Sequence, residues 1–320
     1  MSKHGELPAA YVRDLEEERP EERWLIEDLW GRAAVGVIGG SPKLGKSWLG
    51  LDFAVSVASA TPALDRYKVA DPGTTLVYLA EDARAQVRAR IASICRHRGL
   101  GLDALDVVAI TADTLRLDTE RDQERLRRTL DRFRPRLVLL DPLVRLHALD
   151  ENSSLEIARL LGYFRELQRS FDCAVILVHH ASKKQRSRPG QSLRGSSDLH
   201  AFGDSNACLA ARGDRVALTL EHRSARAPEP IALELVVTDS GQETTHLRVC
   251  DYHDTTADHA PPLETRILEL LRGAGALKRT ELRSQLRVNN HRLGEALAQL
   301  ENRGVLRRDA GGWSRSSDSQ

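Results

Sequence analysis

Short apolar runs alternate along the chain with longer stretches in which apolar residues recur at every third or fourth position. The runs predict buried strands, and the longer stretches predict helices with one apolar face. This alternation extends from Ala33 to about Val249 and is typical of a mostly parallel sheet covered by helices. We therefore expect an α/β fold for this part of the chain.

The expected strands and helices follow one another in a regular order. Strands are expected at residues 33–38, 74–79, near 107, 137–140 and 174–178, with helices at 46–60, 83–98, 119–133 and 153–171. Three later runs, at 207–211, 216–220 and 231–237, alternate apolar with polar residues and lie close together in the sequence. We expect these runs to extend the sheet as antiparallel strands.

Polar stretches set the expected domain boundaries. Residues 1–23 are polar, with six acidic residues between Asp14 and Glu22, and we interpret them as a solvated leader or as a subunit-docking arm. Residues 251–262 are polar and end in two prolines, which suits a linker. The boundaries predict an α/β domain over 24–250, a second domain over 263–315 and a polar tail over 316–320.

Composition narrows the class of protein. A formal net charge of +1 at pH 7, with 41% hydrophobic residues, excludes a fibrous or disordered chain and requires any surface for a polyanion to be local. The four cysteines lack metal-ligand spacing, so we expect buried reduced thiols and a cytoplasmic protein. No apolar run approaches the roughly 18 residues that a membrane span needs, so we expect neither secretion nor a membrane partner.

The segment GGSPKLGKS, between the first expected strand and the first expected helix, carries the strongest chemical signal. It contains the pattern G-x-x-x-x-G-K-S, whose glycines let backbone N–H groups converge on phosphates at the positive end of a helix dipole. Lys46 is expected to reach the β- and γ-phosphates of ATP, and Ser47 to hold Mg²⁺ through its hydroxyl. The residues expected to contact the nucleotide are Gly40, Ser41, Pro42, Lys43, Leu44, Gly45, Lys46, Ser47 and Trp48.

Two carboxylates follow expected strands and complete this chemistry. Asp141 comes directly after an apolar run, at the carboxyl end of a strand, where ligands of open α/β sheets bind, so we expect it to help hold Mg²⁺. Glu81 follows another strand and would lie beside the phosphate loop if that strand neighbours the first. We assign Glu81 as the base that orients the attacking water, with the adjacent Asp82 as the competing assignment.

Two adjacent histidines, His179 and His180, end the next expected strand. A γ-phosphate sensor is the favoured interpretation, and a purely structural pair is the alternative. A zinc site is disfavoured because no Cys, Asp or Glu stands nearby at ligand spacing.

A basic segment, 181–197, follows these histidines directly. It contains five basic residues and no acidic ones: Lys183, Lys184, Arg186, Arg188 and Arg194. The two interpretations are a solvated basic loop and, favoured here, a loop that tracks the phosphates of single-stranded nucleic acid.

Five segments of the chain are characteristic in combination: GSPKLGKSWLGLDFAVSVA, LVYLAED, LVLLDPLVRLHALDENSS, VILVHHASKK and LRGSS. Together they resemble the RepA-like branch of the RecA/DnaB superfamily, the hexameric ATPases that include plasmid replicative helicases, over about residues 24–249. The resemblance implies a RecA-like core, ring assembly, ATP bound between subunits and movement along single-stranded DNA. It gives Glu81, Asp141 and His179 or His180 the same roles as above.

The resemblance also implies an arginine that acts on the nucleotide of a neighbouring subunit. Related ring ATPases often carry a Lys-x-Arg pair after a late strand, whereas this chain has Glu221-His222-Arg223. Arg223 is therefore the first candidate for this role, and Arg226 is the second. The missing lysine weakens the expectation of strong hydrolysis coupled around a ring.

Residues 263–315 predict a winged helix-turn-helix domain. Helices are expected at 263–272, at 280–286 after a cap at Thr280, and from Asn290, followed by a hairpin wing at 305–308 and 313–315. From residue 263 onward, 11 Lys and Arg stand against 7 Asp and Glu. In a DNA-reading domain, the third helix and the wing would contact duplex DNA through Asn290, Arg292, Arg307 and Arg308. Docking to a protein is the alternative.

These observations favour an ATP-hydrolysing, ring-forming DNA motor, a replicative-type helicase of a plasmid or mobile element. ATP and Mg²⁺ are the expected cofactors. Single-stranded DNA, further copies of the chain, and duplex DNA or a replication protein at the winged helix are the expected partners. The competing hypothesis is a nucleotide-switched DNA-binding regulator or a recombination accessory ATPase without strand-separating activity.

Overall fold

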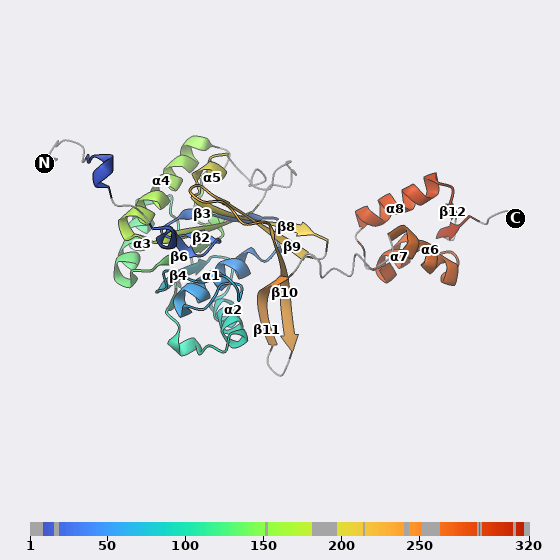
Figure 1. Ribbon diagram of the computed structural model, residues 1–320, viewed down its shortest axis with the longest axis horizontal. Coiled ribbons are helices and arrows are strands. Elements are labelled where there is room, and N and C mark those ends of the chain that lie inside the picture. Colours follow the sequence, from blue (N-terminus) through green and yellow to red (C-terminus); the bar gives the residue numbers. More distant parts are fainter. Residues whose placement is uncertain are drawn as a thin grey trace. The chain divides into compact units, whose positions relative to one another are not determined.

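A computed structural model gives the fold of the chain (Figure 1). The structure describes residues 9–15, 19–150, 153–180, 197–213, 215–239, 243–250, 263–286, 288, 290–309 and 312–316. The chain divides into two compact units, Met1–Cys250 and Asp251–Gln320.

A nine-stranded sheet lies at the centre of the first unit, in the order β11-β10-β9-β8-β3-β7-β6-β4-β5. Six neighbouring strands are parallel: β3 (Val35–Gly40), β4 (Thr75–Leu79), β5 (Val107–Ala109), β6 (Leu137–Asp141), β7 (Ala174–His180) and β8 (Ser205–Arg212). Three antiparallel strands continue the sheet: β9 (Arg215–His222), β10 (Ile231–Asp239) and β11 (Glu243–Cys250). The expectation of an α/β fold with a mostly parallel sheet is confirmed.

Both faces of the parallel strands are buried. On β6, for example, Leu137 and Leu139 belong to one apolar core, whereas Val138 and Leu140 belong to the other. The first core packs against α1 (Lys46–Ser59) and α2 (Arg84–His97), and the second against α3 (Glu120–Phe133) and α4 (Ser154–Phe171) (Figure 1). Burial on both faces is the reason why these strands read as continuous apolar runs.

Short elements complete this unit. A second, two-stranded sheet joins β1 (Trp24–Ile26) to β2 (Trp30–Gly31). A six-residue helix, α5 (Ser197–Phe202), precedes β8. Four 3-10 turns are η1 (Val12–Asp14), η2 (Pro20–Arg23), η3 (Leu102–Ala104) and η4 (Leu143–Arg145).

The first strand lies two residues later than expected, at 35–40 instead of 33–38. It continues through Gly39 and Gly40 because these residues pair with His179 and His180 on β7, and Gly40 also pairs with Leu209 on β8. Neighbours on both sides therefore hold the backbone extended as far as the first glycine of the phosphate loop.

Strand β11 has no counterpart among the expected elements. Its sequence, ETTHLRVC, contains few large apolar residues, so it lacks the run that marked the other strands. Pairing with β10 over eight positions defines it, and α2 packs against it. The ring of His246 stacks on that of His97 with centroids 3.4 Å apart, and the Ser93 hydroxyl donates to the carbonyl of Thr245.

The second unit contains three helices and a two-stranded antiparallel sheet. The helices are α6 (Leu263–Ala274), α7 (Arg279–Leu286) and α8 (Asn290–Asn302), and β12 (Leu306–Asp309) pairs with β13 (Gly312–Arg315). Leucines of all three helices share a core with Trp313 of β13. The expected cap at Thr280 is wrong, because α7 begins at Arg279 and the backbone N–H of Lys278 donates to the Glu281 carboxylate at 2.7 Å.

Candidate nucleotide site

The loop between β3 and α1 contains the complete phosphate-binding pattern. Gly40 has φ = +149°, and a Cβ there would come within 2.4 Å of the Leu209 carbonyl oxygen. Gly45 has φ = +83° and directly precedes the first residue of α1. Both glycines are therefore required by the backbone, since one has no room for a side chain and the other has a left-handed conformation. The loop directs the N-terminus of α1, with its unpaired N–H groups, toward the carboxyl edge of the sheet.

Lys46 lies buried at the start of α1. Its Nζ donates to the carbonyl oxygens of Gly40 at 2.9 Å and of Ser41 at 2.8 Å. Burial lowers the pKa of the ammonium group, while the nearby Asp141 carboxylate opposes that shift. The ammonium is thus held inside the loop, where it is available to phosphate oxygens at the cost of exchanging two backbone contacts.

Asp141 is the last residue of β6 and is buried at the same edge. Burial raises the pKa of its carboxyl group to about 6, although a hydrogen bond from the Ser47 hydroxyl lowers it. Its Oδ2 atom is buried without a hydrogen-bond partner in the described part of the structure. An unsatisfied buried carboxylate oxygen beside a hydroxyl suits Mg²⁺, a hard cation that prefers oxygen ligands.

Glu81 and Asp82 follow β4 in a turn before α2, but β4 does not neighbour β3. Strands β7 and β6 lie between them, so the route by which Glu81 was expected to reach the loop is wrong. The turn instead approaches the site from the β6 side, where Leu79 pairs with Asp141 and the N–H of Ala80 donates to the Asp141 carbonyl at 2.7 Å.

The two carboxylates of this turn have different surroundings. The Glu81 side chain is 48% exposed and accepts a hydrogen bond from Arg145 Nε at 2.8 Å. The Asp82 side chain is 16% exposed and forms an ion pair with Arg90 Nη1 at 2.6 Å. The charge of Asp82 also raises the pKa of Asp141, whereas Arg90 lowers it. Asp82 is therefore part of the electrostatic environment of Asp141, and the assignment of Glu81 as the base stays a prediction.

Arg90 and Arg145 were not among the residues expected at this site. Arg90 also lies over the ring of Trp48, 5.6 Å from its centroid, and so links α2 to the first turn of α1. The sequence did contain a signal for Arg90. Helix α2 has four arginines and no acidic residue, and it begins soon after the acidic pair Glu81 and Asp82. Opposite charges this close in the sequence attract one another, and the structure shows one such pair, Arg90 with Asp82.

His179 and His180 end β7 beside the phosphate loop. Their register partners on β3 are Gly39 and Gly40, and His179 is buried. This placement is compatible with the expected sensor and with a structural pair. No cluster of three or more His, Cys, Asp or Glu side chains able to hold a metal occurs among the described residues, which gives the zinc alternative no support.

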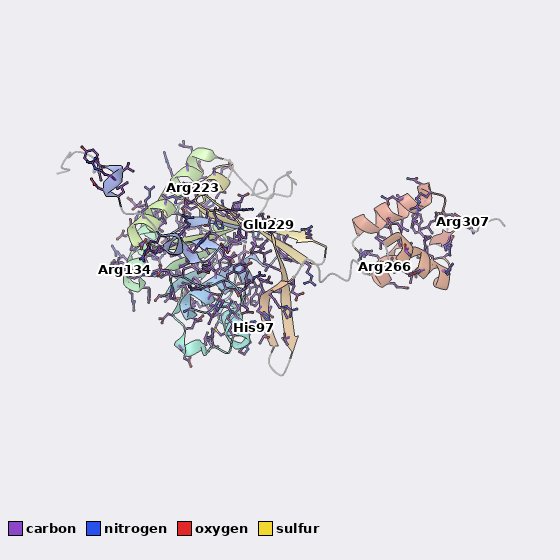
Figure 2. All side chains as sticks on the ribbon, viewed as in Figure 1. His97, Arg134, Arg223, Glu229, Arg266 and Arg307 are labelled. Carbon is purple, nitrogen blue, oxygen red and sulfur yellow. The ribbon has the colours of Figure 1, made fainter. Side chains whose placement is uncertain are left out.

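Arg223 lies at the amino ends of the parallel strands, opposite the carboxyl ends where the phosphate loop begins. It follows β9, and its N–H donates to Asp204 O while Asp204 N donates to Val35 O, at the start of β3. Its guanidinium contacts Ala201 O at 3.1 Å and Phe202 O at 3.2 Å in α5 (Figure 2). Five residues of extended β3, about 17 Å, separate this edge from the loop. Arg223 therefore cannot reach the nucleotide of its own chain, and Arg226 is exposed in the loop that follows.

The residues expected to contact nucleic acid are only partly described. Lys183, Lys184, Arg186, Arg188 and Arg194 lie outside the described residues. In the second unit, Asn290 and Arg292 belong to α8 and Arg308 to β12, and Arg307 is exposed on β12 (Figure 2).

Within the described ranges, none of the helices combines the length and apolar character that crossing a bilayer requires.

Comparison with known proteins gives a family and a fold. The family model described as an AAA domain matches residues 2–186. A solved structure titled "ATPase Domain of G40P" is similar with a TM-score of 0.50 at 15% identity, over 67% of this chain and 84% of that chain. A structure of the RadB recombinase has a TM-score of 0.49 at 15% identity, over 64% of this chain and 88% of that one.

Proposed function

The chain belongs to the AAA domain family and is a P-loop ATPase, and from this premise we propose that it works as a ring-forming motor on single-stranded DNA. The proposed role is that of a replicative-type helicase of a plasmid or mobile element. One observation carries the proposal: Lys46, Ser47 and Asp141, three candidate groups for hydrolysis, lie together at the carboxyl ends of the parallel strands, whereas Arg223, the candidate arginine, lies beyond their amino ends.

If Arg223 assists hydrolysis, this separation favours its action on a second copy of the chain. Lys46, Ser47 and Asp141 lie together at the carboxyl edge, and Arg223 lies about one strand length away. An arginine that assists phosphoryl transfer has to reach the γ-phosphate. Arg223 can do so only on a neighbouring subunit, and a head-to-tail arrangement of copies supplies that contact and closes into a ring if the rotation fits.

Within one site, the proposed roles follow from the groups present. Lys46 would exchange its contacts with Gly40 and Ser41 for the β- and γ-phosphate oxygens. Ser47 and the unpartnered oxygen of Asp141 would hold Mg²⁺, which when bound neutralises charge on the phosphates. Glu81 would orient the attacking water once it leaves Arg145, and the histidines that end β7 would contact the γ-phosphate.

The second unit is proposed to be a winged helix-turn-helix that directs the motor to duplex DNA or to a replication protein. Three helices followed by a small antiparallel sheet have the order that this fold requires. Asn290 and Arg292, at the start of the third helix, and Arg307 and Arg308, on β12, are the proposed contacts.

The test is ATP hydrolysis by the full chain with and without single-stranded DNA. Lys46→Ala should reduce turnover at least about 100-fold, because it removes the charge that faces the transferred phosphoryl group. Lys68→Ala is the matched control, since Lys68 is an exposed lysine that pairs with Glu27 away from the loop. Turnover that ignores both DNA and the Lys46 substitution would refute the motor.

The second candidate is a regulator or recombination accessory ATPase in which nucleotide switches DNA binding without strand separation. The separate C-terminal unit and Glu221, which stands where related ring ATPases carry lysine, favour it. Full-length protein that binds duplex DNA tightly only with ATP, and separates no strands, would support this candidate over the motor.

A further inference from the structure

Two arginines pair with the two carboxylates of the turn after β4, and the pairs differ in exposure. The Arg90 and Asp82 side chains are 31% and 16% exposed, and Arg90 also lies over the Trp48 ring. The Arg145 and Glu81 side chains are 62% and 48% exposed. Exposed ion pairs are weak, because solvent screens the charges and both side chains lose freedom. The Arg145–Glu81 pair is therefore the one that another charged group can displace.

The backbone that presents Arg145 is fixed. Arg145 is the last residue of η4, and its N–H donates to the Pro142 carbonyl oxygen at 3.1 Å. The Leu143 and Leu146 side chains are both buried, which anchors the turn on either side of Arg145. Release of Glu81 therefore needs a change in two side chains and leaves the path of the backbone as it is.

The contact with Arg145 engages the proposed base. Arg145 Nε donates to Glu81 Oε1 at 2.8 Å. A carboxylate that accepts the proton of the attacking water needs an oxygen directed at that water. If Glu81 is the base, the observed pair holds its carboxylate beside η4 and so restrains it.

An anion is the partner that Arg145 can take in exchange for Glu81. A guanidinium has N–H donors in a planar fork and no acceptor, so carboxylates and phosphates match its geometry. Among the residues that the structure describes, Nη1 and Nη2 of Arg145 donate no hydrogen bond, which leaves them available to a second anion. Phosphate contacts of arginine are charge-assisted and often bidentate, so a phosphate competes well with a single bond from Nε.

We propose that Arg145 binds a phosphate of single-stranded DNA in exchange for Glu81, and that it restrains hydrolysis until the strand is bound. This inference rests on the proposed function, from which it takes the nucleic acid. Its location supports it, because η4 follows the carboxyl end of β6, where ligands of open α/β sheets bind. The exposure of Arg145 favours a strand that lies along the surface over the nucleotide, whose phosphates are expected against the buried Lys46.

The first experiment measures ATP turnover by the full chain, without DNA and with saturating oligothymidylate. Arg145→Ala should raise the turnover without DNA about two- to fivefold, the size of effect that an exposed ion pair allows, and should reduce the stimulation by DNA by the same factor. Arg145→Lys keeps the positive charge, so both readings should lie between those of wild type and of Arg145→Ala.

Arg128→Ala is the matched control for the first experiment. Arg128 pairs with Glu124 on α3 at 3.0 Å, and the two side chains are 78% and 50% exposed, close to the values for Arg145 and Glu81. Loss of this second exposed pair should change neither the turnover without DNA nor the stimulation.

The second experiment tests the phosphate contact itself. Binding of a fluorescent oligothymidylate to the full chain is measured without ATP at several salt concentrations. Each neutralised phosphate of a single strand contributes about 0.7 to the slope of log K against log salt concentration. Arg145→Ala should reduce the slope by about 0.7, whereas Arg128→Ala should leave it unchanged. Affinity for a fluorescent ATP analogue without DNA should change less than about threefold in Arg145→Ala, because the proposed partner is the strand.

Three results would overturn the proposal. Turnover of Arg145→Ala without DNA that equals or falls below that of wild type excludes the restraint. An unchanged salt slope excludes the contact with DNA, and a larger loss of affinity for the ATP analogue makes the nucleotide the partner of Arg145. Melting temperatures establish that all variants are folded.

Failure of this inference is distinguishable from failure of the proposed motor. The motor is refuted by turnover of the wild type that ignores DNA and by the Lys46→Ala assay. The turnover of Arg145→Ala without DNA reports on the contact between Arg145 and Glu81 in either case.

Discussion

Two aspartates at opposite edges of the parallel strands are held in different ways. Asp204, at the amino edge, accepts hydrogen bonds from Val35 N at 3.3 Å and from Arg165, and Arg223 Nη1 lies 3.5 Å away. Asp141, at the carboxyl edge, is more deeply buried, has one oxygen without a partner in the described structure, and has a pKa raised to about 6.

The two aspartates differ in how far their hydrogen-bonding capacity is satisfied. Native proteins satisfy buried polar groups, because an unsatisfied one costs about 1–3 kcal/mol. Asp204 obeys this rule and connects β3, α4 and β9. Asp141 departs from it, because its Oδ2 atom has no partner in the described structure, and in the proposed site Mg²⁺ would supply one. The predictions below test whether the two edges are complementary halves of one site built from two copies.

The largest effect is expected at the amino edge, from Arg223→Ala. If Arg223 acts on the nucleotide of another copy, the substitution should lower ATP turnover about 10³-fold. Mixing this variant with Lys46→Ala chains should restore part of the activity, because some interfaces then join an intact loop to an intact arginine. Arg226→Ala is the control, with a loss below about tenfold. Mixtures that stay inactive would contradict action between copies.

The next effect distinguishes the two carboxylates after β4. Glu81→Gln should lower turnover about 100-fold while nucleotide binding is retained, because a general base contributes roughly 10²–10⁴ to the rate. Asp82→Asn should cost less than about tenfold, since it loses an ion pair with Arg90 and keeps the base. Single-turnover hydrolysis and nucleotide titration measure both steps. The reverse order of effects would move the catalytic role to Asp82.

Asp141→Asn should remove activity yet stabilise the Mg²⁺-free protein. The folded-state pKa of about 6 lies above the ordinary aspartate value of 3.8, so the native state binds a proton more tightly. Stability should therefore fall as pH rises from about 4 to 6, with a total of roughly 2–3 kcal/mol at about 1.4 kcal/mol per pKa unit. The variant should lack this slope and be about 1–3 kcal/mol more stable at pH 8. Urea denaturation at pH 5 and pH 8 without Mg²⁺ provides the measurement.

Asp204→Asn should give the smallest change, with the opposite sign. It weakens charge-assisted hydrogen bonds to Arg165 and Arg223 at a half-buried site, so the free energy of unfolding should fall by about 1–2 kcal/mol at pH 8. The same urea titration measures it. An unchanged unfolding free energy for Asp204→Asn together with a loss for Asp141→Asn would remove the contrast between the edges.

Much of the fold could be predicted because its signals are local. The apolar runs at 137–140 and 174–178 correspond to β6 and β7. A strand that is buried on both faces needs apolar residues at consecutive positions, whichever strands it pairs with. β11 was missed because its definition depends on pairing with β10 and on contact with α2, through the stack of His97 and His246. Neither contact leaves a pattern within the strand itself.

The sequence alone determined the phosphate loop, the α/β class and the presence of carboxylates after strands, since each depends on residues within one turn or one strand. Only the tertiary structure decided the strand order β3-β7-β6-β4. That order brings Asp82 close enough to raise the pKa of Asp141, while Glu81 pairs with Arg145. The tertiary structure alone placed Arg223 an entire strand away from Lys46. These relations join residues more than 40 positions apart, and packing of the sheet, not local sequence, brings them together or keeps them apart.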